Sequence, residues 1–466
     1  MASFPRPASL SSRHRLGLFP LLLGALLAVL WLAGGASRGD VMGQVIVRAA
    51  AWLVTIVAVL AGARVTVGRA TPVLLLLVAA LALALLQLVP MPPQMWQALP
   101  GRHVLVQGAA LAGEAQVWRP WSIVPDATIN AASALIVPIA TWLLATNLGE
   151  RERRWLPAML LCLVGASAFV GLLQFTGALQ NNPLVNDTPG QVGGTFANRN
   201  HFALCLAMGC LLAPVWGVAD ARRSALRAPI AWGMVLLFLL TILASGSRAG
   251  FGLGIMALLL GLLLSRDAMR QMLARYPRWV FPALVAGIVA VVALFVLLSV
   301  VADRAVSINR LFDVDQGQDM RGRGLPVVLA MIGAHFPVGS GLGSFDPMFR
   351  IHEPFSLLKP TYFNHAHNDF LEVVLDAGLP GLVLLLAALG WWIWASIRVW
   401  RADAGAGFVQ AKLGSAMLFL VIVASLFDYP ARTPMMMAMM VIAALWLSWG
   451  AAVVASSALP ERGQLL

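Results

Sequence analysis

Long apolar runs recur along the whole chain, and they restrict the fold more than any other feature of the sequence. Runs close to the ~20 residues that a helix needs to cross a bilayer lie at residues 16–34, 45–63, 71–89, 128–147, 155–176, 200–217, 229–245, 250–265, 279–301, 379–398, 411–427 and 433–455. Of the 466 residues, 60% are hydrophobic and 11% are charged, a profile that soluble domains of this length do not have. The sequence therefore predicts an all-α polytopic membrane protein with about 12 transmembrane helices.

The positive charges indicate how this helix bundle is oriented. The formal net charge is +12, and Lys359 and Lys412 are the only lysines. With the N-terminus in the cytoplasm, the inner loops hold 19 of the 32 Lys and Arg residues and the short outer segments hold seven. Such an excess marks the cytoplasmic side, whereas long loops are translocated largely regardless of charge. We therefore expect a multi-pass membrane protein with both termini cytoplasmic, and no nucleic-acid partner.

Three of the expected outer segments are long, namely 90–127, 177–199 and 302–378, and only the last is large enough for a small domain. The predicted organisation is nine transmembrane helices in 1–301, a periplasmic loop with short helices in 302–378, and transmembrane helices 10–12 in 379–466. A loop helix around Leu325–His335 should be broken by Pro337 and the glycines that follow it. The first apolar run follows three arginines and is long enough to span, so we interpret it as an uncleaved first helix.

The segment from His367 to Gly381 places a titratable pair at the outer mouth of a membrane helix. Asn368 can cap a helix through Asp369–Ala377, Gly378 can end that helix in the left-handed conformation, and Pro380 prevents simple continuation. Polar groups beside lipid indicate a functional site by default. We therefore expect the active site here, on the periplasmic side.

The predicted topology brings other unusual polar residues to the same membrane face, from five elements that are distant in sequence. These residues are Asn198, Arg199, Asn200, His201, Arg248, Arg321, Arg323, His365, His367, Asp428 and Arg432. Such convergence is harder to obtain by accident than any single motif.

The chemistry of these groups suits a phosphate-containing substrate. Arg248, in a Ser/Gly turn, could extend to lipid headgroups, or its planar guanidinium could bind a phosphate. Arg321 and Arg323 could complete such a clamp or be solvated loop charges. His367 titrates near neutral pH, so it can accept a proton from a sugar hydroxyl, or it could merely lie at the lipid interface.

Three carboxylates follow the histidine pair. Asp369, Glu372 and Asp376 lie on one helical face. They could orient a partner, but the favoured interpretation is a stripe exposed to water.

A metal site is not indicated. His365 and His367 would need a third ligand such as His352, Glu353 or Asp369, and no HExxH or Cys/His set supplies one. The glycines at 339, 341 and 343 lack the strand–turn–helix context of a nucleotide site. We expect no cofactor.

At these residues the chain resembles the O-antigen ligase and O-antigen polymerase family of bacterial polysaccharide and lipopolysaccharide assembly. The resembling segments are 88–93, 194–202, 245–248, 337–345, 365–381 and 426–432. The most distinctive feature is His367-Asn368, nine further residues, and then Gly378-Leu-Pro-Gly381.

The resemblance implies a GT-C-type membrane glycosyltransferase of the bacterial inner membrane that works without metal at the periplasmic face. Such enzymes transfer a glycan from undecaprenyl diphosphate to an acceptor hydroxyl, with inversion at the anomeric carbon. By this resemblance Arg248 and a loop arginine, Arg321 rather than Arg323, bind the diphosphate, and His367 activates the acceptor or assists the leaving group. The further candidates for substrate binding are Arg323, Asn368, His365, Asn198, Arg199, His201, Asp428 and Arg432.

Several alternatives stay open at this point. The acceptor could be lipid A-core, a growing polysaccharide or a protein hydroxyl, so ligase and polymerase are not separated. A transporter or flippase without chemistry would instead predict charges at mid-membrane and matched internal repeats, which the sequence lacks. A structural scaffold for polysaccharide assembly is a third possibility.

Overall fold

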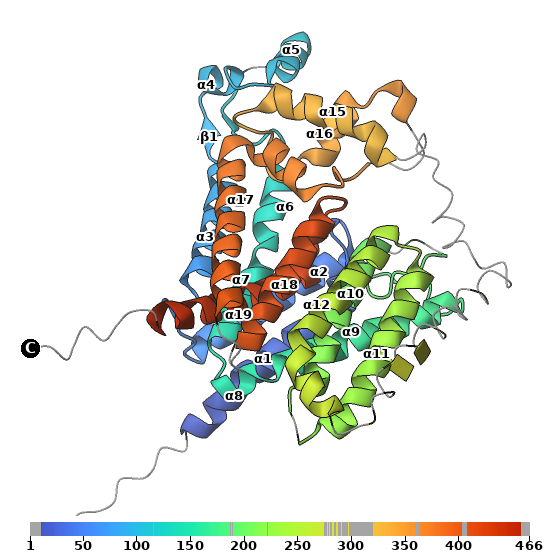
Figure 1. Cartoon of the computed structure of the whole chain (residues 1–466). Coiled ribbons are helices and arrows are strands. Elements are labelled where there is room, and N and C mark those ends of the chain that lie inside the picture. Colours follow the sequence, from blue (N-terminus) through green and yellow to red (C-terminus); the bar gives the residue numbers. More distant parts are fainter. Residues whose placement is uncertain are drawn as a thin grey trace, which may run out of the picture.

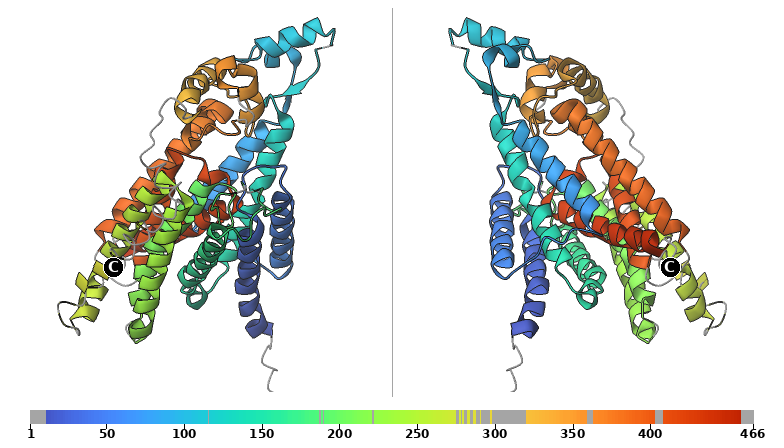
Figure 2. Two further views of the ribbon diagram at one scale, coloured as in Figure 1. Left: turned by 90° about the vertical axis from the view of Figure 1, so that its right-hand side faces the viewer. Right: turned by 90° about the vertical axis from the view of Figure 1, so that its left-hand side faces the viewer.

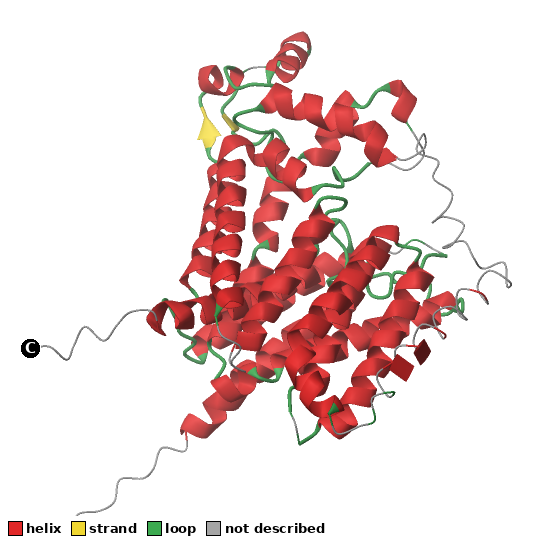
Figure 3. Ribbon diagram, viewed as in Figure 1, coloured by secondary structure: helices red, strands yellow, loops and turns green. Residues whose placement is uncertain are grey.

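The computed structural model is almost entirely helical (Figures 1 and 3). It describes residues 11–114, 116–186, 188, 190–220, 222–274, 320–358, 363–402 and 408–457, together with isolated positions between 277 and 297. The only strands in these residues are β1 (Pro90–Met91) and β2 (Arg119–Pro120), which pair antiparallel. The prediction of an all-α protein is therefore correct apart from this short ribbon.

Eight helical segments of the described chain are long and apolar enough to cross a membrane. They are α2 (Met42–Leu60), α6–α7 (Pro125–Ala134 and Ile136–Thr146), α8–α9 (Glu150–Arg153 and Leu156–Phe175), α10 (Arg199–Val218), α11 (Ser224–Ser245), α12 (Arg248–Leu273), α17 (Asp369–Arg401) and α19 (Pro434–Ser457). Three shorter apolar helices accompany them: α1 (Ser11–Ala33), α3 (Thr71–Leu86) and α18 (Val409–Ser425). The polytopic architecture is confirmed, whereas the count of twelve stays a prediction, since the expected span 279–301 lies largely outside the described residues.

Helix α10 lies at the centre of the bundle. It packs against α9, α11, α12 and α18, and 89% of the residues in its apolar stretch are buried. A Cβ added at Gly209 would come within 2.6 Å of Phe238 and 2.7 Å of Val164. Small residues of this kind let membrane helices approach closely, so the packing of α10 depends on shape rather than on exclusion of water.

Helix α17 consists of two helical parts that meet at a kink at Gly378. This glycine has φ 56° and ψ −141°, a non-helical conformation with positive φ, and a second helical part then runs through Pro380 to Arg401. The expected interruption at Gly378 is therefore confirmed, and Pro380 falls in the first turn of the second part, where its missing N–H costs little. The large loop contacts α17 at this kink, because the N–H of Leu379 donates to the carbonyl of Pro337 at 2.7 Å.

The large loop forms helices α15 (Met320–His335) and α16 (Phe345–His352) and the short 3-10 helix η1 (Phe355–Leu357). The expected helix before Pro337 is confirmed. These elements share a small apolar core that includes Val328, Phe345 and Phe349. Figures 1 and 2 show them at one end of the molecule, together with α4 (Pro93–Gln97) and α5 (His103–Leu111).

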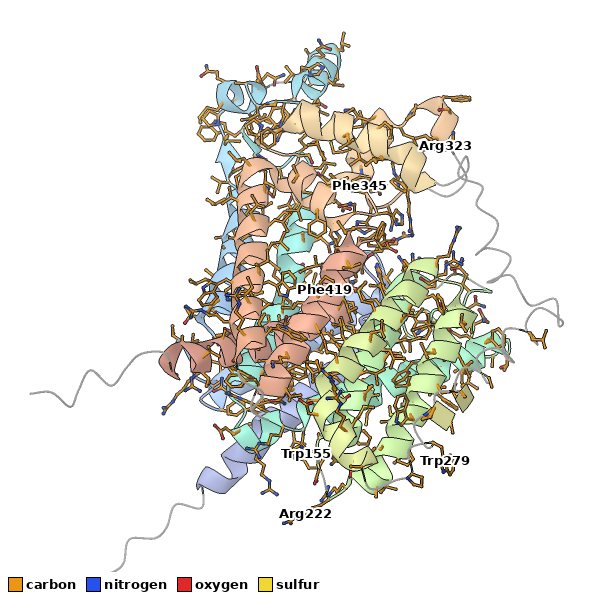
Figure 4. All side chains as sticks on the ribbon, viewed as in Figure 1. Trp155, Arg222, Trp279, Arg323, Phe345 and Phe419 are labelled. Atoms are coloured by element: carbon orange, nitrogen blue, oxygen red, sulfur yellow. The ribbon has the colours of Figure 1, made fainter. Side chains whose placement is uncertain are left out.

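Buried Arg102 joins the segment 90–122 to the large loop. Its guanidinium donates to the carbonyls of Pro100, Gly339 and Trp121 at 2.8–3.0 Å. The two outer segments therefore form one layer, which the sequence did not indicate. Figure 4 shows Arg323 in this layer and Arg222 at the opposite end of the bundle, as the predicted sidedness requires, although the orientation itself stays a prediction.

Candidate active site

Asp428 is the centre of the polar cluster. It lies between α18 and α19, directly before the 3-10 helix η3 (Pro430–Arg432), and is 4% exposed. Six donor groups surround its carboxylate: Nδ1 of His367 at 3.1 Å, Nε2 of His201 at 3.7 Å, Nδ2 of Asn198 at 3.1 Å, Nδ2 of Asn200 at 2.6 Å, a guanidinium nitrogen of Arg321 at 3.5 Å and the N–H of Tyr429 at 3.1 Å.

These donors keep Asp428 ionised. Burial raises the pKa of its carboxyl group, but the interactions with His201 and His367 outweigh this and hold the pKa well below its usual value. A buried carboxylate surrounded by donors is stable only while all of them remain in place. Asp428 therefore acts as a fixed negative charge that gathers side chains from three other segments of the chain.

His367 is held in an unusual backbone conformation. Its φ is +50°, which is uncommon for a residue other than glycine and often marks functional sites. Burial lowers the pKa of His367 below its ordinary value, although Asp428 counteracts this effect. The ring is therefore neutral at neutral pH, and the carboxylate fixes Nδ1 as the protonated nitrogen. Nε2 is left with its lone pair free to accept a proton.

Three helix caps fix this geometry. The side chains of Asn198, Ser247 and Asn368 begin α10, α12 and α17 by accepting from the N–H groups of Asn200 at 2.8 Å, Gly250 at 3.0 Å and Leu371 at 3.0 Å. The predicted cap at Asn368 is therefore confirmed, and its amide also donates to the carbonyl of Leu426 at 3.1 Å.

Arg248 is connected to the cluster by a hydrogen-bonded chain. It is the first residue of α12 and its side chain is exposed. The preceding Ser247 donates to Asn200 at 2.8 Å, and Asn200 donates to Asp428. Arg248 therefore lies at the same end of the bundle as His367.

The two loop arginines differ in their contacts. A guanidinium nitrogen of Arg321 lies 3.5 Å from Asp428, and Arg321 also lines a small pocket with His201 and Ala249. Arg323 instead donates to the carbonyl of Ser356 at 2.7 Å. Of the two, only Arg321 contacts the Asp428 cluster through an ion pair that the described residues show.

The carboxylates of α17 do not form a wetted stripe, so that expectation is wrong. Asp369, Glu372 and Asp376 are 7%, 0% and 0% exposed. Arg432 inserts among them, with guanidinium-to-oxygen distances of 3.4, 3.3 and 3.7 Å respectively. The sequence could not show this, because Arg432 comes from a turn more than 50 residues away.

Glu372 also fixes the loop segment that carries His367. One of its oxygens lies 2.8 Å from Nδ1 of His365, and the other accepts from the N–H of Ala366 at 2.8 Å. The His365-Ala366-His367 segment is thus fixed at both ends, by Glu372 and by Asp428. Arg432 serves this arrangement structurally, because its guanidinium is occupied by carboxylates.

Tyr429 is a member of the site that sequence reasoning did not single out. Its ring lies 4.1 Å from the ring of His365, 4.9 Å from that of His201 and 5.0 Å from that of His367, between centroids. Burial, followed by the charge of Asp428, raises the pKa of its hydroxyl, so the phenol stays protonated. The one feature of the sequence that could have indicated Tyr429 is its position next to Asp428.

The predicted residues therefore fall into two groups. His367, His201, Asn198, Arg321 and Asp428 meet directly, whereas His365 and Arg432 belong to the adjoining Glu372 cluster. Arg199, the first residue of α10, and Arg248 flank the first group. The two loop histidines bind different carboxylates, and within the described residues no three His, Cys, Asp or Glu side chains are grouped as metal ligands would be.

Comparisons with known proteins match part of the chain. The chain is similar to the probable peptidoglycan glycosyltransferase FtsW of Thioalkalivibrio sulfidiphilus, with 29% identity over 159 residues. That match covers 34% of this chain and 35% of the relative, so the chain spans about a third of the length of the curated relative it matches. The sequence model of the family described as O-antigen ligase matches residues 233–386, from α11 through the His367 loop into α17. This match confirms the resemblance to the O-antigen ligase family over residues 233–386, and together with the relative it supports a membrane protein of glycosyltransferase-like function.

Proposed function

We propose that the protein transfers a glycan from undecaprenyl diphosphate to an acceptor hydroxyl at the periplasmic face of the bacterial inner membrane. The observation that carries this proposal is the contact of 3.1 Å between Nδ1 of His367 and the ionised Asp428. This contact leaves Nε2 of the neutral His367 ring available as a base. Arg248 and Arg321, which can bind an anion, lie at the same end of the bundle. The same pairing of a carboxylate and a histidine activates hydroxyl groups in hydrolases on unrelated folds.

The arginines provide for the leaving group. Outside the inner membrane a nucleotide sugar is not at hand, so the donor must arrive already activated on a lipid. Arg248 is exposed at the start of α12, where the helix N-terminus adds further positive potential. Arg321 brings a second guanidinium to the same cluster. Stabilising the charge that develops on a diphosphate is usually the largest catalytic contribution in such a reaction.

The reaction balances without a metal or an added cofactor. Nε2 of His367 takes the proton of the acceptor hydroxyl while the acceptor oxygen bonds to the anomeric carbon. The bond between that carbon and the diphosphate oxygen breaks, and the electron pair leaves with the lipid diphosphate. Attack from the face opposite the leaving group inverts the anomeric carbon, as in GT-C enzymes.

The test is glycan transfer in proteoliposomes that contain purified lipid-linked donor and acceptor. His367→Ala and Arg248→Ala should each lower the transfer rate by about 10²–10³-fold, the usual cost of one preorganised catalytic group. The matched controls are His103→Ala and Arg222→Ala, whose side chains are exposed away from the site.

A second readout separates transfer from transport. The amount of glycan on each leaflet and the amount of newly glycosylated acceptor are measured in the same vesicles. Equal glycan movement without any bond formation, in both the wild type and His367→Ala, would refute the proposal in favour of a flippase. Full transfer by both variants would favour a structural scaffold.

A further inference from the structure

A second cavity lies on the other side of the loop that carries His367. Its volume is about 690 Å³, within the range of ~300–1,000 Å³ typical of ligand pockets. Helices α2, α3, α6, α17, α18 and α19 contribute to its wall. His365 and Arg432 line it, whereas Arg248, Arg321 and Asp428 do not. The cavity is therefore separate from the cluster around Asp428.

Its lining divides into a polar end and an apolar body. Most of the body is aliphatic, with Leu76 and Leu77 from α3, Leu385 and Leu389 from α17, and Val421 from α18. The polar end consists of Ser37, Arg38, Asp40, Gln44, Arg48, Asn130, Asp346, Asn364 and His365. A ligand that fits this division has a hydrocarbon part and a polar headgroup.

The polar end contains one cation that no carboxylate neutralises. Asp40 pairs with Arg38, and Asp346 pairs with Arg350. Among the described residues, Arg48, in the second turn of the membrane helix α2, has polar contacts only with the uncharged Ser133 at 2.8 Å and Gln44 at 3.3 Å. Its Nε is buried and has no partner in the described residues. An ionised group inside a membrane helix without a counter-ion suits an anionic ligand.

We infer that this cavity binds the acceptor, an amphipathic lipid whose hydrocarbon part lies between α3 and α17 and whose anionic headgroup faces Arg48. The inference rests on the proposed function. It assigns the cavity to the second substrate because the arginines proposed for the donor diphosphate lie outside it. His365 borders the cavity and is two residues from His367, so a headgroup here lies beside the proposed base.

This assignment narrows the acceptors that the sequence left open. A lipid-borne acceptor, such as lipid A-core or a lipid-linked polysaccharide, has the hydrocarbon part that the cavity accommodates. A hydroxyl on a soluble protein has none. Because bilayer and cavity are both apolar, the hydrocarbon chains of the lipid have little preference for the cavity over the bilayer. The contact of the headgroup with Arg48 therefore provides the specificity.

The binding test uses two pairs of neighbouring alanines. Ala80 of α3 and Ala388 of α17 line the cavity, whereas the neighbouring Ala79 and Ala387 are exposed. The full-length protein in a neutral maltoside detergent is titrated with dodecyl phosphate, and bound lipid is counted by native mass spectrometry. Ala80→Trp and Ala388→Trp should each weaken binding by about tenfold or more, since a large side chain then occupies the space.

The controls Ala79→Trp and Ala387→Trp should stay within about twofold of the wild type. Arg48→Gln should weaken dodecyl phosphate binding by about tenfold, the effect of one charge-assisted contact, and leave the uncharged dodecyl glucoside unaffected. Arg64→Gln, with an exposed side chain, is its control. Unchanged binding in Ala80→Trp, Ala388→Trp and Arg48→Gln would overturn the inference.

The transfer assay then distinguishes acceptor from donor. Ala80→Trp should raise the KM for a lipid-borne acceptor by about tenfold and leave the KM for the undecaprenyl-diphosphate donor unchanged. A raised donor KM instead would mean that the cavity holds the chain of the donor, and the inference would fail. If the wild type transfers no glycan at all, the proposed function fails, while the dodecyl phosphate titration still decides whether the cavity binds an anionic lipid.

Discussion

The exchange Asp428→Asn tests the centre of the proposed mechanism with the smallest structural change. The amide keeps the shape of the carboxylate and can still accept a hydrogen bond from Nδ1 of His367. It cannot supply the negative charge that stabilises an imidazolium once the proton of the acceptor has been taken. The perturbation therefore removes the charge from the contact of 3.1 Å with His367, and from those with His201 and Arg321, and leaves the base itself in place.

The contact with His367 sets the expected size of the effect on catalysis. Hydrogen bonds to charged groups contribute about 1.5–3 kcal/mol, and each 1.36 kcal/mol of activation free energy is a factor of ten in rate. We therefore expect kcat/KM to fall by about 10- to 150-fold. The assay is glycan transfer in proteoliposomes, with Asp126→Asn as control, because Asp126 is exposed in the first turn of α6.

The pH dependence of activity distinguishes an electrostatic role of Asp428 from a purely structural one, because a structural role would not shift the pH profile. His367 can act as a base only when it is neutral, so activity falls as the pH drops through its pKa. Burial already lowers that pKa, and Asp428 partly offsets the effect. Without the negative charge the pKa falls further, so the acidic limb of the profile should move to lower pH.

The opposite result would refute the reasoning. An acidic limb that moves to higher pH would show that Asp428 does not stabilise the imidazolium. The same conclusion follows if a folded variant, with an unchanged melting temperature, keeps its rate within about twofold of the wild type. Loss of activity with a lower melting temperature and an unmoved limb would make Asp428 a structural residue only.

Three further predictions concern the donor, the carboxylate cluster and the kink. Arg248→Lys keeps the charge but loses the planar fork, so transfer should recover only partly relative to Arg248→Ala, as the KM for the lipid-linked donor will show; full recovery would argue against bidentate phosphate binding. Glu372→Ala removes the carboxylate that Arg432 and His365 share, while Asp369 and Asp376 still pair with Arg432, and should destabilise the protein by about 3–5 kcal/mol, whereas the exposed Glu114→Ala should not change the melting temperature. Gly378→Ala places a Cβ 2.1 Å from the carbonyl oxygen of Pro337 at a positive φ and should lower the melting temperature; Gly390→Ala, with open space around it in the same helix, should not, and equal melting temperatures would contradict the kink.

Much of the architecture could be predicted from the sequence. Transmembrane helices satisfy their own backbone hydrogen bonds, so each apolar run is sufficient to specify a helix in lipid. Local signals also worked where the partner lies within a few residues. The cap at Asn368 and the helix before Pro337 are examples, since both depend on contacts within a few residues.

The site could be predicted only in outline. The collection of polar residues at one end of the bundle follows from the spacing of spans and turns. Which of them touch does not, because a side-chain contact depends on helix rotation and tilt, which apolar runs leave undetermined. Arg432 illustrates the limit, since nothing in its local sequence places it among three carboxylates of α17.

The sequence by itself determined that this chain is a helical membrane protein, where its helices start, and which residue types are available for chemistry at their ends. Tertiary structure alone decided that Asp428 holds His367, that the face of α17 is buried around an arginine, and that a second cavity lies beside the same loop. The physical reason is the separation along the chain over which each interaction acts. Backbone hydrogen bonding and transfer to lipid act within a single segment, whereas ion pairs and cavities need side chains from several segments to meet.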